Sequence, residues 1–177
     1  MSKALADRVD VTLLALQGAH VERQFGLESF TRLVELLLSP QGSAMARFEF
    51  QQVEGLPAAR LAVKATVQLR CQRCLQAFGC PVESHAQLAF VTGEAEAGAE
   101  AEPVPEGWEA ISVDPRRVVL AELVEDELLL SLPLVPRHAD MTACGPAAQV
   151  LAEAEEEPRE DTGTQRPFAN LGKLLKH

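Results

Sequence analysis

Two cysteines separated by two residues are the clearest chemical signal in this sequence. Cys71 and Cys74 have the spacing that lets two thiolates from one tight turn hold one tetrahedral metal ion. Such a pair is half of a zinc site, and His138 and Cys144 are the best candidates for the other two ligands. Because a Cys3His set closes the coordination sphere, we expect a structural zinc ion that clamps the chain and takes no part in catalysis.

Other interpretations of the cysteines stay open. Cys80 is a rival ligand, although its place in an alternating apolar pattern favours packing in the core. Cys71 and Cys74 could also be unligated thiols in a loop. A redox-active pair needs its first cysteine at a helix N-terminus, whereas strands are predicted on both sides of this pair. Asp7 and Asp10 stand where an export signal needs its apolar stretch, so disulfides are not expected.

Three charged residues are candidates for partner binding. Glu127 falls within the apolar stripe of a predicted helix, so its carboxylate either needs a partner or reaches water at the rim of the stripe. Arg70 or Arg73, beside the cysteines, could supply that partner, could contact an RNA phosphate, or could simply be solvated. No glycine-rich phosphate loop or nucleophile elbow accompanies them, so we predict that the protein is not an enzyme.

An antiparallel sheet must position the cysteines. Apolar and polar residues alternate, with the period of a half-buried strand, over residues 44–51, 61–70 and 82–90. The second and third of these runs flank Cys71 and Cys74, which places the pair at a hairpin tip.

Three helices are expected. Asp10 suits an N-cap and Gly18 a C-terminal cap for a short helix over residues 11–17. Two amphipathic helices, over residues 28–38 and from Pro115 to the residue before Pro133, carry single apolar stripes that should pack on the sheet. The predicted fold class is therefore α+β: an antiparallel β-meander with two packing helices, CxxC at a hairpin tip and a disordered acidic C-terminal tail.

The acidic charge is concentrated in the second half of the chain. Residues 1–92 hold 9 basic and 8 acidic side chains, whereas residues 93–177 hold 7 and 18. We expect one α+β domain over residues 1–146, with a mobile acidic loop at 93–107, followed by a disordered acidic tail over 147–177. Within the tail, residues 166–176 have the spacing of a short amphipathic docking motif, in cis or in trans, built from Phe168, Leu171, Lys173 and Leu174.

The overall charge limits the classes of partner. With a net charge of -10, the chain lacks the electrostatic footprint of a general nucleic-acid binder, so any RNA contact must be local. No apolar run reaches the length of a membrane-spanning helix, and we expect a cytoplasmic protein that does not bind membranes.

The order and spacing of four segments resemble the YceD family, the large ribosomal RNA subunit accumulation proteins. Among the residues that match motif positions of this family are the four candidate ligands and Glu125, Glu127 and Phe168. The segments are Val67–Phe78, with its Cys71-Gln-Arg-Cys74 core; Leu120–Pro133; residues 136–144; and the tail from Arg166.

The resemblance implies a function in ribosome biogenesis. It implies a non-catalytic factor that supports large-subunit ribosomal RNA accumulation, with a large-subunit precursor or a ribosomal protein as its partner. The alternative that the residues leave open is a zinc-stabilised protein-interaction adaptor without a ribosomal role, and behind it a thiol redox enzyme.

Overall fold

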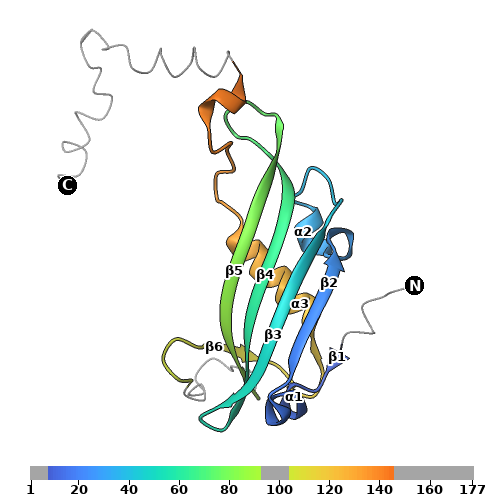
Figure 1. The fold of residues 1–177 in the computed structure, drawn as a ribbon, viewed down its shortest axis with the longest axis vertical. Coiled ribbons are helices and arrows are strands. Elements are labelled where there is room, and N and C mark those ends of the chain that lie inside the picture. The colour runs from blue at the N-terminus through green and yellow to red at the C-terminus, as the bar shows by residue number, and fades with distance from the viewer. Residues whose placement is uncertain (1–7, 93–103, 146–177) are drawn as a thin grey trace, which may run out of the picture. The chain divides into compact units, whose positions relative to one another are not determined.

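A five-stranded sheet is the centre of the fold. The computed structural model describes residues 8–92 and 104–145, and the chain divides into two units, residues 1–138 and 139–177, which are described separately. In the first unit the strand order is β2-β3-β4-β5-β6 (Figure 1). The strands are β2 (His20–Gly26), β3 (Ser43–Val53), β4 (Leu56–Arg70), β5 (Ala77–Val91) and β6 (Glu109–Ser112).

The predicted antiparallel meander is confirmed for β2 to β5. The turn between β3 and β4 is formed by Glu54 and Gly55, with φ of 50° and 87°, as a tight hairpin turn requires. Strand β6 was not predicted, and it runs parallel to β5, pairing with its last four residues, Leu88–Val91. A four-residue strand has too short a pattern to be recognised, and its parallel partner is distant along the chain.

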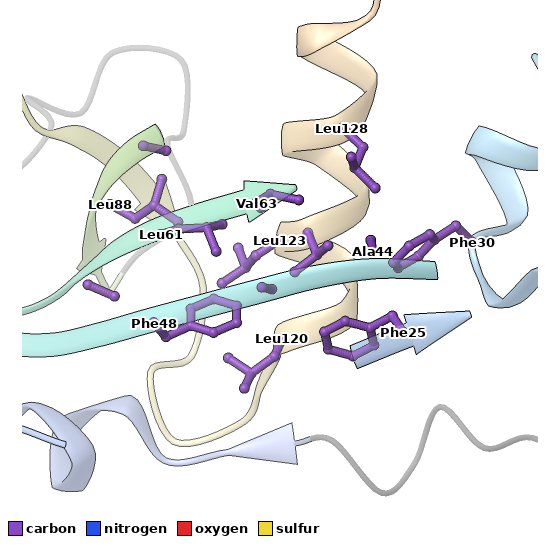
Figure 2. Close-up of a cluster of buried hydrophobic side chains, with 14 of the residues drawn as sticks. Phe25, Phe30, Ala44, Phe48, Leu61, Val63, Leu88, Leu120, Leu123 and Leu128 are labelled. Atoms are coloured by element: carbon purple, nitrogen blue, oxygen red, sulfur yellow. The ribbon is translucent and has the colours of Figure 1, made fainter. Parts of the chain in front are cut away.

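The core lies between the sheet and helix α3 (Leu120–Ser131). Alternate residues of β3, among them Phe48 and Phe50, point into it, as the period-two pattern predicts. From the helix, Leu120, Leu123 and Leu128 meet this face of the sheet (Figure 2). Burying this apolar cluster supplies the main stabilisation of the fold.

The short N-terminal helix has the predicted bounds and caps. Helix α1 spans Val11–Gln17; the side chain of Asp10 accepts a hydrogen bond from Leu13 N at 3.1 Å. Gly18 ends the helix in the left-handed conformation, with φ of 59°, and its N–H bonds back to the last turn.

The predicted helix over residues 28–38 is wrong. This segment forms a 3-10 turn, η2 (Leu27–Ser29), and a single α-helical turn, α2 (Thr31–Val34), because Phe30 between them is extended. The apolar stripe is also not a single buried face: Phe30 and Leu33 are buried, whereas Leu38 is 41% exposed. Tertiary contacts end the helix early, since the N–H of Leu38 donates to the carbonyl of Gln68 on β4.

Helix α3 is confirmed as the second packing helix, but it does not begin near Pro115. The carbonyl of Pro115 accepts a hydrogen bond from Val11 N in α1, which fixes it outside the helix. A two-residue strand, β7 (Val118–Val119), comes next and pairs with β1 (Arg8–Val9). The helix ends two residues before Pro133, in agreement with the predicted stop.

Some predictions concern residues outside the described ranges. The tail from 147 to 177, the docking motif at 166–176 and most of the acidic loop lie there, and they remain predictions. Of the predicted loop at 93–107, residues 104–107 are described and lead into a turn in which Trp108 N donates to Pro105 O. In the described second unit, the short helix η3 (Met141–Cys144) is capped by Asp140, whose side chain accepts from Thr142 N at 2.9 Å.

Candidate metal centre

The loop between β4 and β5 folds tightly around the first cysteine. The N–H of Cys71 donates to the carbonyl of Gln76 at 2.9 Å, and the carbonyl of Cys71 accepts from Leu75 N at 2.8 Å. Leu75 adopts a φ of 63°, which is uncommon for a residue with a side chain and lets the loop close within six residues. The predicted hairpin tip is thereby confirmed.

The segment after α3 returns to this tip. The carbonyl of Pro136 accepts a hydrogen bond from Gln72 N at 2.8 Å. Two residues later, the ring of His138 packs on Phe78 with a centroid distance of 5.0 Å. These two contacts hold the histidine beside the cysteine loop, although more than sixty residues separate them in the sequence.

Three of the candidate ligands lie together in the first unit. The sulfur atoms of Cys71 and Cys74 and a ring nitrogen of His138 all lie within 4.8 Å of one another. Cys74 Sγ is 3.5 Å from His138 Nδ1. Sulfur and nitrogen ligands of one tetrahedral zinc ion stand roughly 3.5 Å apart, so this spacing fits a shared ion.

The surroundings of Cys71 favour its thiolate form. Burial alone would raise the pKa of this thiol. The backbone N–H groups of Cys74, His138 and Arg73, and the side chain of His138, act in the opposite direction and lower the pKa from 9.0 to about 5. One of these groups, Arg73 N, donates to the sulfur at 3.4 Å. A thiolate is the form that binds a metal ion.

The other two cysteines have separate positions. Cys144 is the last residue of η3 in the second unit and is buried. Cys80 lies on β5 opposite Val67 and packs against the core while half-buried, which confirms the packing interpretation. Burial raises the pKa of the Cys80 thiol, so this side chain is less suited to metal binding than Cys71.

The three charged candidates are not brought together as the sequence suggested. Arg70 ends β4 and Arg73 lies in the cysteine loop, so both stand at the hairpin tip. Glu127 lies on α3, and its carboxylate accepts a hydrogen bond from the hydroxyl of Ser84 on β5. The observed partner of Glu127 is therefore Ser84 and not one of the suggested arginines.

Glu125 is a buried carboxylate that the apolar pattern did not reveal. Its Oε1 accepts from the backbone N–H groups of Arg32 at 2.6 Å and Leu33 at 3.0 Å, and its Oε2 pairs with the Arg32 guanidinium at 3.0 Å. Hydrogen bonds from this guanidinium to Asp126 and to Glu125 raise the pKa of Arg32. Glu125 thus caps α2 from a neighbouring helix. Only the family resemblance marked this residue, because it lies outside the apolar stripe of α3.

Comparisons with known proteins cover all the residues of the candidate metal centre. The family model of "Large ribosomal RNA subunit accumulation protein YceD" matches residues 59–175. A protein of that name from Haemophilus influenzae is 28% identical over 152 residues, covering 85% of this chain and 84% of the relative. No solved structure matches. The family match includes the cysteine hairpin, α3 and all four candidate ligands, and the chain therefore belongs to the YceD family of large ribosomal RNA subunit accumulation proteins.

Proposed function

We propose that this protein supports the accumulation of large-subunit ribosomal RNA as a non-catalytic factor in ribosome assembly. The observation that carries the proposal is the family match, which extends over both segments of the candidate metal centre. The description of the Haemophilus influenzae relative as a large ribosomal RNA subunit accumulation protein supports the same role. Its partner would be a large-subunit precursor or a ribosomal protein, and its place of action the cytoplasm, where large subunits assemble.

The proposed metal centre is a zinc site formed by Cys71, Cys74, His138 and Cys144. Three of these ligands stand at a spacing that suits one tetrahedral ion. Cys144 follows His138 by six residues, so the chain between them can bring its thiolate to the same ion. Three thiolates and one imidazole are ligands that zinc prefers.

A site of this composition would be structural. Four protein ligands leave no open position at the ion for water or substrate, which supports a role outside catalysis. When bound, the ion would supply a cross-link between the hairpin tip and the segment after α3. The chain's own residues already hold these parts together through the Gln72–Pro136 hydrogen bond, and the ion would fix their geometry more tightly.

Partner contacts are proposed at three places. Arg70 and Arg73 at the hairpin tip could make a local contact with an RNA phosphate, and Glu127 a polar contact from α3. The C-terminal motif, with Phe168, Leu171, Lys173 and Leu174, is the proposed anchor for a protein partner. These residues combine apolar side chains with basic charge, as a docking segment for a partly apolar surface requires.

The experiment compares two cysteine variants. In cells lacking the protein, we expect reduced large-subunit ribosomal RNA, restored by the parent and by Cys80→Ser but not by Cys74→Ser. The parent should sediment with large-subunit precursors on a gradient, and metal analysis should find about one zinc ion in the parent and in Cys80→Ser. Normal ribosomal RNA without the protein, together with no precursor association, would reject the ribosomal role and favour a zinc-stabilised adaptor.

A further inference from the structure

An open apolar groove lies at the edge of the sheet, between α3 and β6. It has a volume of about 370 Å³, and its apolar lining includes Leu88 of β5, Ile111 of β6 and Leu123 of α3. Leu130, at the lip of the groove, is 78% exposed. Exposed leucine next to a hollow with apolar walls is typical of a surface that binds another apolar side chain.

The rim of this groove is acidic. Glu109 and Glu127 stand on it, together with Asp126, whose charge is partly compensated by Arg32 at 2.6 Å. No basic side chain lines the groove within the described part of the chain. The last turn of α3 also contains no basic residue, so the negative end of the helix dipole adds to the carboxylates.

The combination of an apolar floor and an acidic rim selects the chemistry of the occupant. A nucleic acid is disfavoured, because its phosphates would be repelled by the carboxylates and by the net charge of -10 of the chain. A protein segment that carries an apolar side chain between lysine or arginine residues is complementary to both features.

We propose that the groove between α3 and β6 binds a basic amphipathic segment of a protein partner. A leucine-sized side chain occupies the hollow against Leu123 and Leu130, and flanking lysine or arginine side chains pair with Glu109 and Glu127. The identification of this partner with a lysine- and arginine-rich extension of a ribosomal protein rests on the proposed function.

The test uses a synthetic peptide and the zinc-loaded full chain. A labelled 14-residue peptide of leucine and lysine at helical spacing is titrated at physiological salt, and its binding is followed by fluorescence anisotropy. We expect saturable binding that is lost when the lysines are replaced by glutamate or the leucines by serine. The absence of saturable binding to the parent overturns the proposal.

Matched variants locate the binding site. Peptide binding should weaken at least fivefold in Leu130→Gln, because the apolar contact at the lip of the groove is lost. It should weaken by the same factor in the double variant Glu109→Gln with Glu127→Gln, because two acidic charges of the rim are lost. The first control is Leu16→Gln, which changes an exposed leucine on α1. The second is Glu49→Gln with Glu54→Gln, which removes the same charge from β3 and from the turn after it, at two residues that do not line the groove. Both controls should bind within twofold of the parent, and equal weakening by the controls overturns the proposal.

Two further results separate the alternatives. If replacing Phe168 and Leu171 by alanine tightens peptide binding tenfold, the chain's own C-terminal motif competes for the groove, and the proposal of an external partner is overturned. The peptide assay contains no ribosome, so a failure of groove binding leaves the ribosomal RNA measurement unaffected. Conversely, unchanged ribosomal RNA in cells lacking the protein, together with no precursor association, rejects the proposed function while the groove measurement still stands.

Discussion

Removing the carboxylate of Glu125 should be among the most destabilising single changes on α3. This side chain is only 7% exposed and accepts from two backbone N–H groups at the start of α2. Helix α2 has no other cap, because Phe30 stands at its N-cap position and makes no side-chain hydrogen bond there. In Glu125→Ala, the N–H groups of Arg32 and Leu33 lose their acceptor.

The magnitude follows from these contacts. The buried N–H of Leu33, left without an acceptor, costs roughly 1 to 3 kcal/mol, and the partly buried N–H of Arg32 costs less. The ion pair with Arg32 adds less, because the arginine side chain is 53% exposed and regains water when the carboxylate is gone. Together these contributions give a loss of roughly 3 to 5 kcal/mol in the free energy of unfolding for Glu125→Ala.

Related variants test the cause of this loss. Glu125→Gln keeps one acceptor oxygen but turns an amide donor toward Arg32, so it should cost about half as much as Glu125→Ala. Asp126→Ala removes only an exposed ion pair with Arg32 and should cost less than about 1 kcal/mol. Urea unfolding followed by circular dichroism, with zinc saturating throughout, measures these free energies. A loss below 1 kcal/mol in Glu125→Ala, or equal losses in Glu125→Ala and Asp126→Ala, would refute the capping argument.

Three further predictions concern the metal centre and the tail. Adding a chelator should lower the urea midpoint of the parent and leave Cys74→Ser unchanged; equal responses would show that the cysteine holds no stabilising ion. In the metal-free protein, the pKa of Cys71 is lowered from 9.0 to about 5, so folding releases its proton and the stability from this thiolate falls as the pH drops from about 9 to about 5. Urea midpoints measured across that range should rise with pH more steeply in the parent than in Cys71→Ser, and identical slopes would contradict the thiolate assignment. Replacing Phe168 and Leu171 by alanine should weaken association with large-subunit precursors at least tenfold on a gradient, because two apolar anchors of about 1 kcal/mol or more each are removed. Unchanged association would exclude the tail as the docking element.

Local signals in the sequence predicted the parts of the fold that local interactions determine. Asp10 and Gly18 define α1 because capping involves groups within one turn of the chain. The alternation around Phe48 predicted β3 because one face of that strand is buried along its length. The alternating runs on both sides of Cys71 and Cys74 likewise predicted the hairpin tip, and the CxxC spacing identified half of the candidate site.

The parts that were missed depend on contacts between distant segments. The apolar residues from Phe30 to Leu38 have helical spacing, but the helix is a single turn that Glu125 caps at its start, and Leu38 beyond it donates a hydrogen bond to Gln68 on β4. Strand β6 is defined by its pairing with the end of β5, a partner that no local pattern identifies. The packing of His138 beside the cysteine loop depends in the same way on tertiary contacts, and the sequence could only suggest it through residue type.

The short β6 has a consequence for aggregation. Because it pairs with only the last four residues of β5, the first part of that long strand lies at an edge of the described sheet. An open edge is a template on which a second molecule can add a strand. Pro81 removes one backbone donor from this edge, and the charged side chain of Glu83 interrupts its apolar character. Resistance to edge-to-edge association therefore depends on a few residues of β5, among them Pro81 and Glu83.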